Sequence, residues 1–155
     1  MKVFNKLMLG AAALALLPGC SLFQSKVSYD KFHEKAQEAH EKGHSYKKAV
    51  VNGTMESGDT SIDIKKAEFT LKSGVWTPAD DVSLMAALVG AMLLSEEAYL
   101  VPEDEKTTYY VGGGFKTVTK DDDSTGTMVF NNAGLVTSAK GSGESKINVT
   151  VKYSK

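Results

Sequence analysis

The sequence contains no arginine, and all 18 of its basic residues are lysine. Arginine supplies the planar fork that reads phosphates and base edges through two hydrogen bonds at once. Lys2 and Lys6 fall in an N-terminal segment described below, so 16 lysines face 19 acidic residues in the rest of the chain, a formal net charge of −3. An acidic surface without arginine argues against a nucleic-acid partner, and it does not attract anionic lipid headgroups.

Long hydrophobic runs are also lacking. The run from Leu7 to Leu17 is shorter than the roughly 20 apolar residues that a helix needs to cross a bilayer. Together with Lys2 and Lys6 it has the order of an export signal, which we expect to span residues 1–19. The remaining length allows one compact domain, and 42% hydrophobic and 24% charged residues are typical of a chain that folds in water.

Only one cysteine is present, and it follows this segment directly. Leu17-Pro18-Gly19-Cys20 resembles the lipobox of bacterial lipoproteins, in which cleavage occurs before the cysteine. The resemblance implies that Cys20 receives a diacylglyceryl group and a further acyl chain such as palmitate. Two or three chains anchor a protein firmly, whereas one anchors it marginally. Ser21 follows, and by resemblance to lipoprotein sorting it would permit transfer to the outer membrane of a double-membrane bacterium.

The sequence therefore predicts three parts: a signal peptide over 1–19, a lipid-anchored tether over 20–27, and a single α+β domain over 28–155. The expected location is the cell envelope, on the non-cytoplasmic side of a membrane. The expected membrane contact is the lipid on Cys20.

Two helices are expected in the domain. Ser28 is suited to cap an amphipathic helix over residues 29–42 that ends at Gly43. Thr77-Pro78 has the pattern of a helix start, and the sequence predicts a second helix over 78–99, ended by Pro102. No charged residue lies between Val82 and Leu94, so this helix has to be covered on more than one side.

The other segments alternate as strands do. The expected strands span residues 46–55, 61–72, 107–111, 115–120, 127–130, 135–140 and 146–153. A change of apolar parity near Lys65 and Lys66 indicates a bulge, and Gly134 indicates a hairpin loop. The predicted fold is α+β: a curved antiparallel sheet of about six strands against one long apolar helix, with the N-terminal amphipathic helix beside it. This order of elements resembles the half-barrel of lipoprotein carriers and lipid-binding lipoproteins.

Three polar motifs favour structural interpretations. His33 and His40 lie two helical turns apart, about 10 Å along the axis, too far to share one metal ion. The run from Asp121 to Gly126 begins like a calcium loop, but position 12 is Asn132 where a bidentate glutamate is needed, which favours an acidic turn. The glycines at 112–114 lack the lysine and helix start of a phosphate loop, which favours a bend. We therefore expect no metal and no cofactor.

No catalytic motif is recognisable, so we expect no enzymatic activity. The strongest functional signal is the second helix, which offers more apolar surface than one sheet face buries. Its candidate ligand-binding residues are Val82, Met85, Leu88, Val89, Met92 and Leu93. They are either ordinary core or the wall of a site for an acyl chain or another apolar ligand. The expected function is a non-enzymatic binding module for an apolar molecule or lipid; the alternative is an envelope structural or assembly protein that contacts other proteins.

Overall fold

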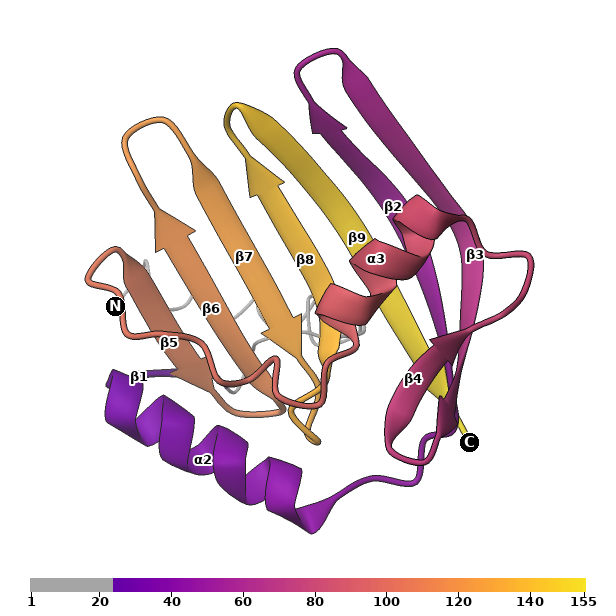
Figure 1. Ribbon diagram of the computed structural model, residues 1–155. Coiled ribbons are helices and arrows are strands. Elements are labelled where there is room, and N and C mark those ends of the chain that lie inside the picture. The colour runs from indigo at the N-terminus through magenta and orange to yellow at the C-terminus, as the bar shows by residue number, and fades with distance from the viewer. Residues whose placement is uncertain (1–23) are drawn as a thin grey trace, which may run out of the picture.

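The computed structural model describes residues 24–155, so the expected signal peptide and Cys20 lie outside the described residues. Within that range the chain forms two helices and one open, nine-stranded antiparallel sheet (Figure 1). The helices are α2 (Tyr29–Lys42) and α3 (Leu84–Leu93). The strands are β1 (Ser25–Val27), β2 (Lys48–Ser57), β3 (Thr60–Lys72), β4 (Val75–Pro78), β5 (Thr107–Val111), β6 (Phe115–Lys120), β7 (Thr125–Phe130), β8 (Val136–Ser142) and β9 (Ser145–Ser154).

The α+β class and the antiparallel sheet are confirmed, but the expected strand number of about six is too low. The strand order is β1-β5-β6-β7-β8-β9-β2-β3-β4, and every neighbouring pair is antiparallel. The two strands absent from the prediction, β1 and β4, are short and lie at the two edges of the sheet. Strand β1 also occupies part of the expected tether, because Ser25–Val27 pairs with β5.

The first helix agrees with its prediction. The Ser28 hydroxyl accepts a hydrogen bond from the backbone N–H of Lys31 at 3.2 Å, and Gly43, at φ +70°, donates its N–H to His40 O. Phe32 is buried near the start of the helix, where its ring contacts those of Tyr109, Phe115 and Phe130. These contacts hold α2 across the ends of the strands in the β5–β8 half of the sheet (Figure 1).

The expected bulge is present in the β2–β3 hairpin. Between the pairs Val51–Ala67 and Gly53–Ile64, β3 contains one more residue than β2. The extra residue lies at the predicted place, and the backbone N–H of Lys66, at φ +49°, donates to the Asn52 side chain at 2.8 Å. Because the bulge restores the alternation, apolar side chains on both sides of it point to the same face.

Glycine-rich and acidic turns also match their structural interpretations. The glycines at 112–114 form the turn between β5 and β6. The run from Asp121 to Ser124 joins β6 to β7, and Asp121 N–H donates to Ser124 O. Gly134 has φ +78° in the turn between β7 and β8, as expected.

The second helix is the main correction. Helix α3 spans ten residues instead of the expected 78–99, and it begins after Ser83 rather than after Thr77. The segment that contains the expected start forms β4, which pairs with the end of β3 through contacts such as Leu71 with Trp76. Proline is tolerated here because β4 is an edge strand. Beyond Leu94 the chain continues in turns, with Leu94 and Tyr99 packed onto the sheet.

Candidate apolar contact site

Local signals and tertiary packing together define α3. The Ser83 hydroxyl accepts a hydrogen bond from Ala86 N–H at 3.2 Å, which caps the first turn. The helix ends where Leu94 N–H donates to Gly90 O at 2.8 Å. It lies across the face of the sheet near β9, β2 and β3 (Figure 1).

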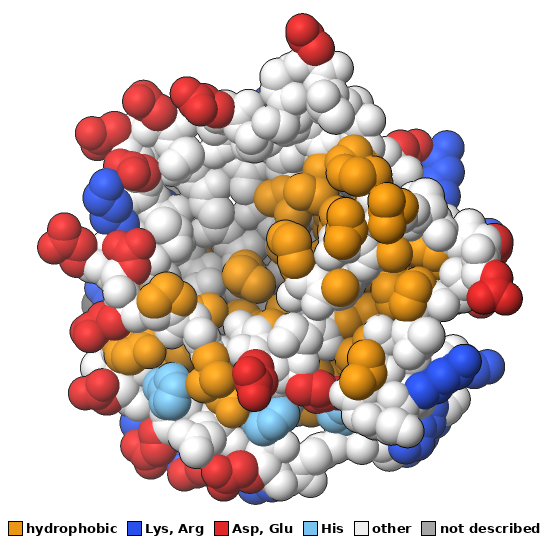
Figure 2. Space-filling view, viewed as in Figure 1, with side chains coloured by type: hydrophobic (Ala, Val, Ile, Leu, Met, Phe, Trp, Pro, Cys, Tyr) orange, Lys and Arg blue, Asp and Glu red, His pale blue; other side chains and the backbone are white. Residues whose placement is uncertain are grey.

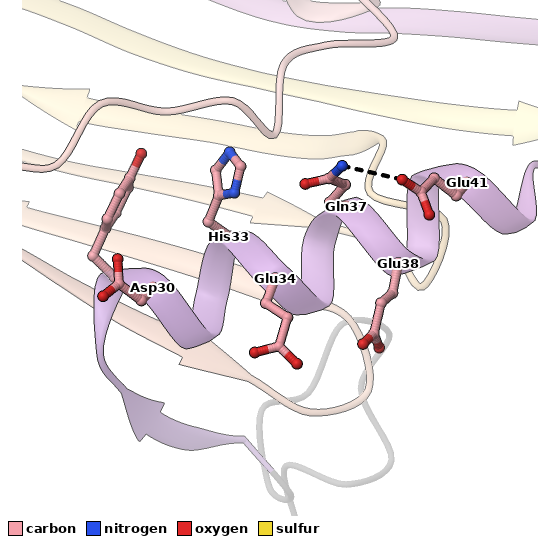
Figure 3. A pocket seen from close by; sticks show the side chains of 7 residues that line it. Asp30, His33, Glu34, Gln37, Glu38 and Glu41 are labelled. Carbon is pink, nitrogen blue, oxygen red and sulfur yellow. Dashed lines mark hydrogen bonds between the residues drawn. The ribbon is translucent and has the colours of Figure 1, made fainter.

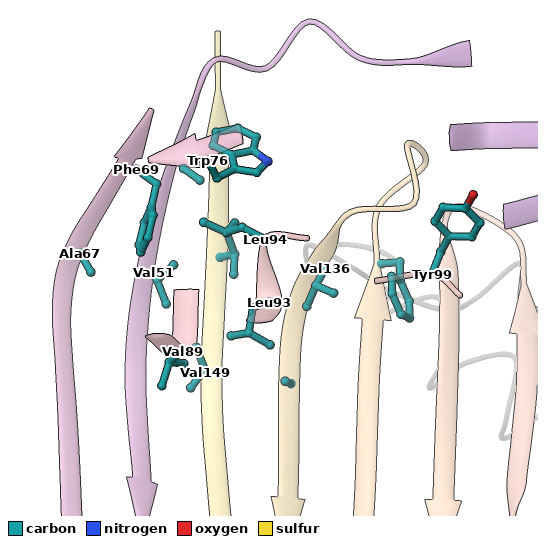
Figure 4. Packing of buried hydrophobic residues seen from close by; sticks show 14 of the residues in the cluster. Val51, Ala67, Phe69, Trp76, Val89, Leu93, Leu94, Tyr99, Val136 and Val149 are labelled. Carbon is teal, nitrogen blue, oxygen red and sulfur yellow. The ribbon is translucent and has the colours of Figure 1, made fainter. Parts of the chain in front are cut away.

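The side of α3 that faces the sheet is tightly packed. Ala86, Val89, Gly90 and Leu93 are buried. A Cβ atom on Gly90 would stand 2.0 Å from Cζ of Phe69, so the Phe69 ring already fills the space against the helix backbone. Figure 4 shows the surrounding core side chains from β2, β3, β8 and β9, which include Val51, Val136 and Val149. Side chains of the protein itself therefore occupy the space between the Gly90 turn of α3 and the sheet, whereas a groove of about 410 Å³ lies between the start of the helix and residues 63–67 of β3.

The opposite side of α3 is apolar and open to solvent. Four large side chains are exposed on it: Leu84 at 74%, Met85 at 48%, Leu88 at 52% and Met92 at 68%. We call these four residues the α3 outer face. Figure 2 shows hydrophobic side chains gathered over α3, with acidic side chains around much of the rim of the same view. Exposed apolar residues that are contiguous commonly mark a contact surface.

The six residues singled out in the sequence thus separate into two groups. Val89 and Leu93 belong to the core, and Val82 is half-buried against it. Met85, Leu88 and Met92 lie on the outer face. Sequence reasoning missed Leu84, the most exposed of the four, although it lies in the same uncharged stretch. Whether any of these residues contacts a ligand stays a prediction.

A second apolar feature lies on the same face of the sheet. Met55 pairs with both Ile62 and Ile147 at the far ends of β2, β3 and β9. The three side chains line a small groove of about 240 Å³. Ile62 and Ile147 precede Ile64 and Val149 by two residues, so they share a face with those core side chains. Ligand pockets usually measure about 300–1,000 Å³, so this groove is too small to enclose a ligand of ordinary size.

A histidine fixes the segment that follows α3. His44 Nδ1 accepts a hydrogen bond from the N–H of Tyr46 at 3.2 Å, which leaves the proton of the neutral ring on Nε2. His44 Nε2 lies 3.1 Å from Glu96 Oε1, and the ring stacks on Trp76 at 6.3 Å between centroids. This hydrogen bond ties the loop before β2 to the chain just after α3.

Tyr153 continues the same aromatic cluster. Its ring contacts those of Tyr46 and Trp76, and its hydroxyl donates to Val136 O at 2.6 Å. Burial raises the pKa of this hydroxyl well above its usual value, and the nearby Glu96 carboxylate raises it further. The cluster is a buried structural contact on the sheet face that α3 partly covers.

The other two histidines lie on α2. Both ring systems contact Tyr99, with centroid distances of 6.4 Å for His33 and 4.9 Å for His40. Figure 3 shows a shallow groove along α2, about 430 Å³ in volume, where His33 and Gln37 stand among carboxylates that include Glu34 and Glu41. In the described range 24–155, no three histidine, cysteine, aspartate or glutamate side chains are grouped so that they could hold a metal ion.

Among residues 24–155, none of the helices has both the length and the hydropathy to span a bilayer. Comparisons with protein-family models, with curated proteins and with solved structures found no match for this chain.

Proposed function

We propose that this chain is a membrane-tethered lipoprotein of the bacterial cell envelope and a non-enzymatic binding module for an apolar ligand or lipid. The proposed anchor is the lipid on Cys20, and the proposed contact surface is the α3 outer face. The observation that carries the proposal is the exposure of Leu84, Met85, Leu88 and Met92 on a helix whose other side is buried against the core.

Energetics support a contact role for this face. Four large apolar side chains that stay in water forgo on the order of 1 kcal/mol each, given that full burial of such a side chain contributes about 1.5–3 kcal/mol. The core beneath α3 is complete without them. A surface that forgoes this stabilisation in the free domain recovers it when an apolar partner covers it.

Polar groups near α3 favour a binding role over catalysis. His44 is held by Tyr46 and Glu96, and the Tyr153 hydroxyl donates to a backbone carbonyl. These groups make structural contacts. The sequence also has no recognisable nucleophile and base pattern.

The test is recovery of a bound molecule. The domain from Ser21 to Lys155 contains every described element, so it should fold without the anchor. We expect native mass spectrometry and solvent extraction of this domain to recover an apolar molecule or lipid, and Leu88→Glu to abolish its recovery. Thr150→Glu, on an exposed position of the opposite sheet face, is the matched control. A molecule retained equally by both variants, or never recovered, contradicts a ligand at α3.

A second function is an envelope structural or assembly protein that acts through protein contacts. The packing beneath Gly90 favours it, because Phe69 and the neighbouring core side chains fill that space, and the groove beside the start of α3 is lined largely by charged and polar residues. This function predicts specific crosslinks from Met92 to another envelope protein in intact cells. A chain that gives no crosslinked partner from that position argues against it.

The anchor is tested separately in cells. We expect Cys20→Ala to release the protein from the membrane or leave it unprocessed. A Cys20→Ala protein that is still cut at the same place and still sediments with membranes contradicts the lipoprotein assignment.

A further inference from the structure

If Cys20 carries the proposed lipid anchor, the surface nearest to the domain is the bilayer that holds it. We propose that the α3 outer face docks flat on the lipid bilayer itself, with its side chains in the boundary between headgroups and acyl chains, and that the lipid there is zwitterionic. The inference rests on the proposed anchor at Cys20, and it adds the orientation of the domain and the chemistry of its lipid partner.

The first support is the character of the face. Leu84, Met85, Leu88 and Met92 stand outward at 48–74% exposure, and no charged residue interrupts the stretch from Val82 to Leu94. Leucine and methionine are flexible enough to enter an irregular, fluid boundary. A helix that lies in a membrane interface needs only a few such side chains on one side.

The second support is the length of chain between the anchor and the fold. Strand β1 begins at Ser25, five residues after Cys20. Five residues span at most about 18 Å when fully extended. The start of β1 is therefore confined to within about 18 Å of the bilayer surface.

The sheet is wide enough that the distance between α3 and the bilayer depends on the orientation of the domain. Helix α3 contacts β3, which is seven places from β1 in the strand order. At about 4.8 Å per strand this separation is roughly 34 Å for β3, and roughly 24 Å for β9, over which α3 also lies. A domain standing upright on its β1 edge holds α3 in water far from the lipid, whereas a domain lying on the face that carries α3 covers the apolar side chains. The hydrophobic effect favours the second orientation, because that orientation removes the four side chains of the outer face from water.

The size of the face favours a bilayer over a second copy of the chain. A stable protein interface buries about 800 Å² on each partner, which one face of a ten-residue helix does not supply alone. A tethered domain needs less, since the anchor holds it at high effective concentration beside the surface. Docking that would be weak for a free domain is therefore sufficient for an anchored one.

The charged residues around α3 indicate which class of lipid headgroup the outer face contacts. Helix α3 has no lysine, Asp80 and Asp81 precede it, and Glu96 and Glu97 follow it. Basic residues are what draw peripheral helices to anionic headgroups. Lys65 and Lys66 of β3 lie in the same groove as Asp81 and offset the charges at the start of α3. Glu96 is paired with His44, while Glu97 is exposed at the other end. The face therefore has no net positive charge to attract an anionic surface, and zwitterionic headgroups are the better match.

The experiment couples the chain from Cys20 to Lys155 through its only thiol to a maleimide lipid in phosphatidylcholine vesicles. Tryptophan at position 88 (Leu88→Trp) reports on the outer face, and tryptophan at position 150 (Thr150→Trp) is the control on the opposite sheet face. The constant signal of Trp76 is subtracted with the parent chain. We expect brominated acyl chains to quench the tryptophan at 88 at least about fivefold more than the one at 150, with a blue shift only at 88.

Three outcomes overturn the proposal. Equal quenching at the two positions means that α3 does not face the lipid. Stronger quenching at 88 when phosphatidylglycerol replaces part of the phosphatidylcholine contradicts the zwitterionic preference. A dimer of the Ser21–Lys155 domain in sedimentation, dissociated by Leu88→Glu, assigns the face to a second copy instead.

Failure of this inference differs from failure of the proposed function. The vesicle anchor is chemical, so the quenching does not depend on acylation in the cell, which Cys20→Ala tests. Circular dichroism and melting of each variant confirm that the fold is retained, because both changed positions are exposed.

Discussion

Replacing Gly90 by alanine tests how closely α3 lies on the sheet. The new Cβ would stand 2.0 Å from Cζ of Phe69 and 2.7 Å from each of its Cε atoms. Real Cβ atoms do not approach carbon so closely, so either the ring or the helix has to move. Phe69 is 1% exposed, so other core side chains surround the ring that would have to move.

Two opposing effects determine the size of the change. Alanine is better than glycine inside a helix by about 1 kcal/mol, because it restricts the unfolded chain. Overpacking a filled core costs about 1–3 kcal/mol, and three short contacts place this substitution in the upper part of that range. We therefore expect Gly90→Ala to lower the free energy of unfolding by about 1–2 kcal/mol net.

Urea denaturation of the Ser21–Lys155 domain, followed by circular dichroism, measures this change. Ala91→Gly, at an exposed position of the same helix, isolates the propensity effect and should cost about 1 kcal/mol. In a Phe69→Leu background the ring is absent, so Gly90→Ala should instead stabilise by up to about 1 kcal/mol. A Gly90→Ala domain that is more stable than the parent, with Phe69 intact, refutes the close packing of α3.

Three further changes test other contacts. Ser28→Ala removes the cap of α2 and should cost about 1 kcal/mol in the same denaturation assay, with no change if the cap is not formed. Glu96→Gln weakens the contact with His44 and should cost about 1 kcal/mol, whereas exposed Glu97→Gln should stay within about 0.5 kcal/mol. Above pH 10, the Tyr153 hydroxyl stays protonated in the fold but ionises in the unfolded chain, so its contribution is present below pH 10 and is lost as pH rises. Stability measured from pH 9 to 11 should therefore fall less steeply in Tyr153→Phe than in the parent.

The parts of the fold that could be predicted are those with local causes. The cap at Ser28, the apolar stripe through Phe32 and Ala36, and Gly43 all lie within one helix, and α2 has the predicted bounds. The bulge near Lys66 could be predicted for a similar reason, since a change of parity in one strand is visible without its partner.

The error at α3 arose where a local signal competed with a distant partner. Thr77-Pro78 has the residues of a helix start, but Trp76 packs against Tyr153 and His44, and β4 pairs with β3. The contacts of Trp76 join residues that are far apart in the sequence, so the pattern around Pro78 contains no sign of them. The pairing of β4 with β3 is local, because the two-residue turn Ser73-Gly74, with positive φ at both positions, closes a hairpin that was not predicted from the sequence. Tertiary packing outweighs a cap worth about 1 kcal/mol.

The division of the apolar helix into a buried face and an exposed face could not be predicted from the sequence either. Between Val82 and Leu94 the residues are apolar on every side, so periodicity does not show which side meets the sheet. Gly90 decides it, because only that side allows the helix backbone to approach Phe69. The sequence could show that the helix has more apolar surface than one sheet face buries. Only the packed structure shows which of these side chains are exposed.

The free edge of β3 leads to a last prediction. Strand β4 pairs only with residues 69–72 of β3, so the earlier part of β3 has no strand neighbour on that side within residues 24–155. Open edges invite pairing with another chain, and charged side chains and bulges discourage it. On β3 this protection comes from the bulge and from the exposed ion pair of Asp63 with Lys65, 3.3 Å apart.

Removing both members of that ion pair leaves the net charge unchanged, so a change in net charge cannot cause any association that follows. We expect the double change Asp63→Val and Lys65→Val to cause association at concentrations where the parent is monomeric, measured by light scattering. The double change Glu56→Val and Lys146→Val is the control, because these residues face each other on β2 and β9, whose edges are already paired. If both double variants associate equally, apolar exposure alone is responsible and the β3 edge has no special role. If only the first does, the two charges on β3 keep a nine-stranded open sheet from growing further.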